Sequence, residues 1–246
     1  MDTDLRRRML QYYDERASEY EEAYVLGTGT ASIPDPSVFQ VEAPLLGDVV
    51  QEFVQGRVID LACGTAYWLP HYAGRCSSIT LFDQSENMLD QCRKKVAALE
   101  IADRSAIVRG DFFDYQFSPA AYDSALVGFL VSHLTEAQQE FFFAALNHML
   151  VPGGRFLILD SAWSAHRARF NAKVERQQRR LNDGTLFEIY KRYLDEPGHR
   201  RLDGQVPRDA LHRALRNGIS CRLWQLRALD PYDAGPFDAG PFDALA

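Results

Sequence analysis

The chain has 246 residues, of which 46% are hydrophobic, and a formal net charge of −7. This composition is normal for a globular core, and the length favours one domain with insertions. An acidic chain repels a polyanion, so general nucleic-acid binding is not expected, although this does not argue against a local basic site.

The four cysteines show neither metal-type nor C-x-x-C spacing, so free thiols in a reducing compartment are the simplest interpretation. The first eight residues lack an apolar signal core, and no window approaches the roughly 18 apolar residues of a membrane span. We therefore expect a cytoplasmic protein without a membrane segment. The cysteines are Cys63, Cys76, Cys92 and Cys221.

The N-terminal region is predicted to be helical. Residues 4–24 carry apolar side chains at roughly helical spacing and predict an amphipathic helix. Residues 27–36 have the composition of a loop, and a second helix is expected over residues 38–53, with Pro44 near a break.

From residue 57 onward, strand-like and helix-like segments alternate. Ser85 can cap one helix, and Thr135 begins a capping-box pattern before another. Such alternation predicts a doubly wound α/β fold, with a mostly parallel sheet and helices on both faces. The expected strands are residues 57–62, 78–83, 105–109, 123–128 and 154–160, and the expected helices are residues 66–73, 86–99 and 136–149.

After Asp160 the pattern weakens. Residues 166–181 predict a basic helix, and residues 219–229 are the only strand-like run within 182–230. The last residues repeat a Pro/Gly/Asp/Phe unit that cannot build a core. We therefore predict three parts, namely an N-terminal helical lid (1–53), the main domain (54–230) and a low-complexity tail (231–246).

The most informative segment is residues 57–66, in which a buried strand runs into a turn of small residues. Asp83 closes the next apolar run, about 20 residues after the turn, and this pattern is typical of a site that holds a nucleoside through backbone approach and a ribose-binding carboxylate. An ordinary strand-to-helix turn is the alternative. A single glycine, Gly64, and the acid Asp60 argue against a pyrophosphate and favour a ligand with a cationic amino group.

Five motifs in order make the chain similar to the class I S-adenosylmethionine (SAM)-dependent methyltransferases. They are residues 58–65, Asp83, and residues 110–112, 122–127 and 150–155. The resemblance covers roughly residues 10–165. It implies a Rossmann-like methyltransferase fold with an N-terminal helical lid, SAM as cofactor, and a seven-stranded sheet whose last strand is antiparallel. The end of the chain departs from this pattern, because residues 195–246 lack two clear hydrophobic strands.

The resemblance also implies how SAM is bound. Gly64 and the Ala62 backbone would pack on its methionine part, and Asp60 would help to hold the ammonium group. Ala66 stands where a glycine is frequent; at a helix start we expect this alanine to cost little.

For the nucleoside part of SAM, the resemblance implies that Asp83 accepts both ribose hydroxyls. Gln84 and Met88 would flank the adenine. Asp111 would bind the adenine amino group, and Phe112 would border the ring.

At the reacting end, Gly128 and Phe129 would lie near the sulfonium and the methyl acceptor. Tyr13 or Tyr20 would close the site over SAM, unless these rings are simply the apolar face of a surface helix. His133 follows the fourth strand and could accept a proton from the nucleophile, or it could be a hydrogen-bonded histidine where a helix begins.

Arg169, Lys173, Arg176 and Arg180 fall on one face of the helix expected over residues 166–181. They could hold a carboxylate or phosphate of a substrate. A solvated surface with mixed ion pairs is the alternative.

The sequence therefore predicts transfer of a methyl group from SAM to an O, N or C nucleophile of a small molecule. It lacks the motifs of adenine-N6 and cytosine-C5 methyltransferases, and its sparse cysteines fit arsenic methylation poorly. Strand four ends in a Gly-Phe pair rather than an acid, which argues against the metal-dependent catechol type. The alternatives are an RNA or protein methyltransferase using residues 166–192, a non-catalytic SAM-binding protein and, less favoured, a nicotinamide oxidoreductase.

Overall fold

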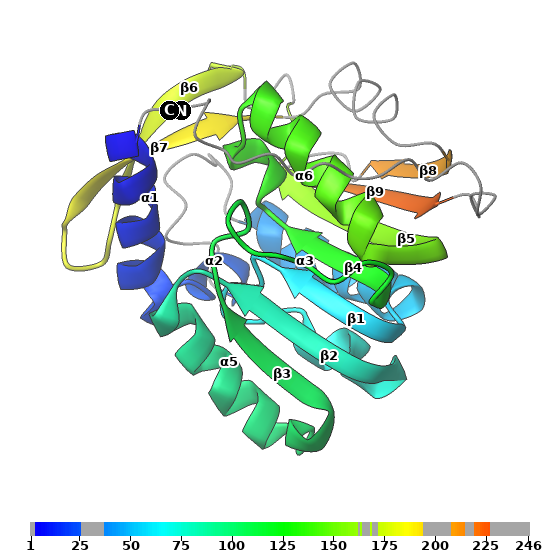
Figure 1. The fold of residues 1–246 in the computed structure, drawn as a ribbon. Helices are drawn as coiled ribbons and strands as arrows, with labels where there is room; N and C mark the ends of the chain where they lie inside the picture. The colour runs from blue at the N-terminus through cyan, green and yellow to red at the C-terminus, as the bar shows by residue number, and fades with distance from the viewer. Residues whose placement is uncertain are drawn as a thin grey trace.

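The computed structural model describes residues 3–25, 37–161, 163, 168, 172–193, 208–214 and 219–226. Its centre is a seven-stranded sheet with strand order β3-β2-β1-β4-β5-β9-β8 (Figure 1). Strands β1 to β5 pair in parallel, whereas β9 runs antiparallel to both β5 and β8. The predicted doubly wound, mostly parallel α/β fold is confirmed.

The five parallel strands lie where the sequence predicts them. Val58, Ile59 and Leu61 of the central strand are fully buried, as expected when helices cover both faces of a parallel sheet. The strands are β1 (Gly56–Leu61), β2 (Cys76–Asp83), β3 (Ser105–Arg109), β4 (Tyr122–Gly128) and β5 (Leu150–Ser161).

The helices between the strands begin at the predicted caps. The Ser85 hydroxyl accepts a hydrogen bond from the Met88 amide, and Thr135 and Gln138 form a capping box. Pro44 lies inside a continuous helix, so the predicted break is wrong, and the helix expected over residues 66–73 is one short turn followed by a 3₁₀ turn. The helices are α3 (Ser37–Phe53), α4 (Leu69–Tyr72), α5 (Glu86–Ala98) and α6 (Glu136–Met149).

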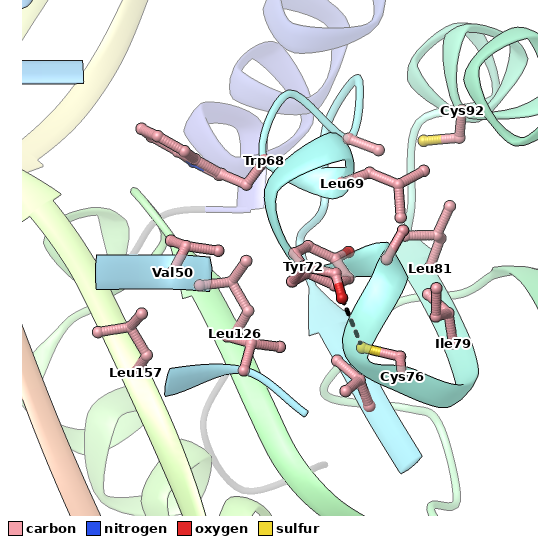
Figure 2. Packing of buried hydrophobic residues seen from close by; sticks show 14 of the residues in the cluster. Val50, Trp68, Leu69, Tyr72, Cys76, Ile79, Leu81, Cys92, Leu126 and Leu157 are labelled. Atoms are coloured by element: carbon pink, nitrogen blue, oxygen red, sulfur yellow. Dashed lines mark hydrogen bonds between the residues drawn. The ribbon is translucent and has the colours of Figure 1, made fainter. Parts of the chain in front are cut away.

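Two apolar layers sandwich the sheet. On one face, sheet residues such as Leu81, Leu126 and Leu157 pack with side chains of α3, α4 and α5, as Figure 2 shows for Val50, Leu69 and their neighbours. The opposite face packs on α6 through its buried phenylalanines. These layers hold the strand ends, and the loops that follow them, in fixed positions.

The N-terminal region is broken into three pieces rather than the one helix predicted over residues 4–24. They are α1 (Thr3–Glu15), a 3₁₀ turn (Arg16–Ser18) and α2 (Glu22–Val25). Helix α1 lies beside the carboxyl ends of β1 and β2 and packs on α5 and on a two-stranded hairpin (Figure 1).

That hairpin corrects a prediction. Residues 174–180 are a strand, β6 (Val174–Arg180), which pairs antiparallel with β7 (Leu186–Arg192), and not part of a basic helix. Burial along β6 alternates with a period of two, so Arg176 and Arg180 are exposed while Arg179 faces inward. The single helical face that would have joined Lys173, Arg176 and Arg180 does not exist, and Arg169 lies outside the described residues.

The C-terminal strands correct a second prediction. β9 (Ile219–Leu226) lies within the strand-like run predicted over residues 219–229, and the sheet has seven strands of which this last one is antiparallel, as the resemblance implies. β7 and β8 (Arg208–Ala214) were not expected, because 219–229 was the only strand-like run predicted within residues 182–230. The sequence of β8 has few strand-favouring residues, and pairing with β9 supplies what intrinsic propensity does not. The predicted tail, residues 231–246, lies outside the described residues.

Candidate functional site

A cavity of about 140 Å³ lies at the carboxyl ends of the parallel strands, next to the point where the strand order reverses between β1 and β4. Loops after β1, β2, β3 and β4 form its floor and sides, and α1 covers it through Arg6, Met9 and Leu10. The sequence-predicted residues that line this cavity are Tyr13, Tyr20, Ala62, Gly64, Asp83, Gln84, Met88, Asp111, Phe112, Gly128, Phe129 and His133.

The turn after β1 has an unusual backbone. Ala62, Gly64 and Ala66 have φ angles of 52°, 54° and 54°, in the left-handed region that costs an alanine about 1–2 kcal/mol. The sequence predicts a helix start at Ala66. The structure instead places Ala66 before α4, in a strained backbone position. Phe129, after β4, has a φ of 57°. Strain of this kind concentrates at functional sites, and Ala62 and Phe129 both line the cavity.

Asp83 is fixed at the end of β2. One carboxylate oxygen accepts a hydrogen bond from the Gly64 amide and the other from the Ser85 amide, each at 2.9 Å. Burial raises the pKa of Asp83, and these backbone hydrogen bonds oppose that shift. The carboxylate thus joins the two turns that flank the cavity, with lone pairs to spare for a ligand.

Asp111 lies on the cavity wall after β3. One of its oxygens accepts a hydrogen bond from the Phe113 amide at 3.0 Å, and the other pairs with the guanidinium of Arg6 from α1. The role of Arg6 was not foreseen, since one arginine within a run of three carries no signal of its own.

His133 and Tyr13 both line the cavity and are paired by a hydrogen bond. The Nδ1 atom of His133 is 2.7 Å from the Tyr190 carbonyl oxygen, so we assign the ring proton to Nδ1. Nε2 then accepts a hydrogen bond from the Tyr13 hydroxyl at 2.8 Å. Burial, followed by the charge of Lys191, lowers the pKa of His133 well below its usual value, so the imidazole is neutral at neutral pH.

Lys191 of β7 lies behind this pair. Its Nζ atom donates to the Ser132 hydroxyl at 2.6 Å and lies 3.5 Å from His133 Nε2 and 3.7 Å from the Asp160 carboxylate. Asp160 in turn accepts a hydrogen bond from the Ser132 amide at 2.8 Å. The roles of Lys191 and Asp160 were not foreseen from the sequence, because they depend on a hairpin that its pattern did not predict.

Asp60 is the one predicted site residue that is not among the cavity-lining residues. It is buried one residue before the end of β1, and its carboxylate accepts a hydrogen bond from the Tyr72 hydroxyl at 2.8 Å. Burial raises the pKa of Asp60 to about 7.

Within the described part of the chain, no cluster of three or more His, Cys, Asp or Glu side chains could hold a metal ion. The described helices include none that is long and apolar enough to cross a membrane. Cys63, Cys76 and Cys92 are free thiols, and the side chain of Cys221 lies outside the described part of the structure.

The chain is similar in sequence and in fold to known proteins. Residues 58–154 fit a family described as "Methyltransferase domain". Demethylmenaquinone methyltransferase of Staphylococcus epidermidis is 30% identical over 112 residues, which span 43% of this chain and 43% of that enzyme. The chain thus spans less than half the length of this curated relative.

Two solved structures illustrate how widely the fold extends. The structure described as "DhpI-SAM-HEP complex" has a TM-score of 0.71 at 21% identity and covers 91% of this chain and 99% of that one. The [4+2]-cyclase SpnF has a TM-score of 0.57 at 15% identity and covers 81% of this chain and 84% of that one. At such identities the likeness concerns the fold alone.

The mostly parallel sheet with its flanking helices matches the Rossmann-like fold of methyltransferases. Residues 58–154 of this chain match the model of a methyltransferase-domain family, in agreement with the resemblance of its motifs.

Proposed function

We propose that the protein transfers a methyl group from SAM to an O, N or C nucleophile of a small molecule. The observation that carries this proposal is the convergence of twelve sequence-predicted residues on one cavity at the switch point of the sheet. The similar DhpI structure is described as a complex that includes SAM, which supports the same cofactor.

The chemistry of the cavity fits the parts of SAM. Asp83, oriented by two backbone amides, is suited to the ribose hydroxyls, and Met88 and Phe112 offer apolar surface for the adenine. Asp111 keeps acceptor capacity for the adenine amino group beside its contact with Arg6. The methyl carbon would then lie near Phe129 and His133.

In the proposed reaction, a lone pair of the acceptor forms a bond to the methyl carbon while the carbon–sulfur bond breaks toward sulfur. S-adenosylhomocysteine leaves, and an O–H or N–H acceptor loses its proton. The Tyr13–His133 pair on the cavity wall would serve as the neutral base, with His133 Nε2 as the terminal proton acceptor. In-line placement of the two reactants supplies much of the rate.

Two alternatives bear on this proposal. The fold is shared with a protein described as a cyclase, so the fold by itself does not select the reaction. An RNA or protein methyltransferase would need an exposed basic surface at residues 166–192, whereas Arg179 and Lys191 are buried and Arg176 is paired with Glu188.

The proposal is tested by titration calorimetry with SAM and with S-adenosylhomocysteine. Asp83→Ala removes the ribose-binding carboxylate and two hydrogen bonds that shape the turn, so we expect SAM affinity to fall by at least about tenfold. Asp103→Ala, at an exposed position before β3, is the matched control and should bind like the wild type.

Unchanged affinity in Asp83→Ala would refute its assignment to the ribose. Absence of binding of both ligands to the wild-type protein at millimolar concentration would refute the proposed function as a whole.

A further inference from the structure

Two buried cations face inward from the β6–β7 hairpin. Arg179 and Lys191 are 9% and 5% exposed, whereas Arg180, the next residue in β6, is exposed. Burying a cation is costly unless an anion or several hydrogen-bond acceptors compensate for the lost water. Their surroundings therefore indicate what the hairpin is built to hold.

Arg179 has only neutral partners among the described residues. Its guanidinium donates to the Gln178 carbonyl oxygen at 3.2 Å and to the side-chain oxygen of Gln177. No carboxylate that the structure describes lies within ion-pair distance of it, in contrast to Arg176 on the outer face, which pairs with Glu188. A guanidinium with five donors and no charged partner is suited to a planar or tetrahedral anion.

Both cations lie close to the reacting end of the cavity. Lys191 approaches His133 directly, and Arg179 is in register with Phe187, whose ring is 5.6 Å from that of Tyr12, the neighbour of Tyr13. Tyr13 and His133 form part of the cavity wall, and Lys191 lies against His133. Both positive charges act on His133, because Lys191 and then Arg179 add to the effect of burial in lowering the pKa of this residue.

We propose that the methyl acceptor carries an anionic group, a carboxylate or a phosphate-type oxyanion, which Arg179 and Lys191 hold at the His133 end of the cavity. This inference rests on the proposed function and specifies the substrate class of the same site. The anion supplies the charged partner that Arg179 lacks, and its binding orients the nucleophilic atom toward the methyl group.

The test measures how inorganic phosphate and acetate raise the melting temperature of the full-length protein, with and without S-adenosylhomocysteine. Arg179→Met replaces the buried cation by an apolar side chain of similar length, which a protein core generally tolerates. Arg180→Met, at the adjacent exposed position of the same strand, is the matched control for charge. If Arg179→Met does not fold, Lys191→Met is compared with Arg180→Met instead.

We expect at least one anion to stabilise the wild type and Arg180→Met equally, and Arg179→Met to need at least about tenfold more of it. Stronger stabilisation by phosphate assigns a phosphate-type acceptor, and stronger stabilisation by acetate assigns a carboxylate. Affinity for S-adenosylhomocysteine should be the same in all variants.

The inference is overturned if neither anion stabilises the wild type, or if Arg179→Met and Arg180→Met lose the response equally. Failure of S-adenosylhomocysteine to bind refutes the proposed function instead, and the anion titration without that ligand still reports on the subsite.

Discussion

Asp60 shows how burial of one carboxyl group couples stability to pH. Its pKa is about 7 in the folded protein, because burial outweighs the hydrogen bond from Tyr72, and near 4 in an unfolded chain. A raised pKa means that the folded state holds the proton more tightly. The associated stabilisation is complete below about pH 4 and is lost as the pH rises through about 7, with an upper bound of roughly 4 kcal/mol.

The same shift predicts a proton linkage for SAM. An ammonium group held by Asp60 favours the ionised carboxyl, so SAM binding near pH 6 should release a proton and tighten as the pH rises toward 7. Calorimetry in two buffers of different ionisation enthalpy measures this release. Asp60→Asn should abolish this proton release. If the wild type releases no proton, Asp60 does not hold the ammonium group and only its contact with Tyr72 remains.

His133 gives a second prediction at the scale of one residue. Because its pKa is lowered well below the usual value, the imidazole remains unprotonated throughout the neutral range, and kcat should show no loss from this group between about pH 6.5 and 8. His133→Phe removes the proton acceptor and should lower kcat by roughly 100-fold with SAM affinity unchanged. An unaltered kcat would mean that in-line placement alone supplies the rate.

Which residues could be foreseen follows from where their information lies. Asp83 and Gly64 are recognised from local spacing, because a turn and an acid on the next parallel strand always meet at the same sheet edge. Arg6, Lys191 and Arg179 acquire their roles only through packing between distant segments, as in the contact of Arg6 with Asp111. No local pattern records such contacts.

At the scale of elements, strands β1 to β5 and helices α5 and α6 were predictable because their apolar residues repeat with a clear period and their caps are explicit. The β6 strand was not, since its inward positions include Gln177 and Arg179 and its outward positions, apart from Val174, are also polar. A strand without apolar alternation resembles a basic helix in sequence. We attribute its polar inner face to the anion subsite proposed for Arg179.

Helix α1 is held over the cavity from two sides. At its carboxyl end, Asp14 accepts hydrogen bonds from the Ser85 hydroxyl at 2.6 Å and the Asn87 side chain at 2.8 Å. On its outer side, Leu5, Met9 and Tyr12 pack on apolar side chains of the hairpin. We infer that α1 and the hairpin act as one cover, so the predicted lid of residues 1–53 would include part of the chain that follows the methyltransferase domain.

For the whole molecule, the mostly parallel sheet and its last strand, β9, could be predicted from the sequence, whereas β8 could not. Strand pairing of β8 depends on the template that β5 and β9 provide, and its own sequence has little strand propensity. The division into lid, main domain and tail stays a prediction.

The central claim is that this fold carries methyl transfer from SAM to a small anionic molecule. It is tested most directly by incubating the protein with SAM labelled by a trideuterated methyl group and a metabolite extract, and analysing the products by mass spectrometry. We predict that one small, negatively chargeable molecule gains the labelled methyl group while an equal amount of S-adenosylhomocysteine forms. The label appearing only in RNA or protein, or no S-adenosylhomocysteine forming although SAM binds, would contradict the claim.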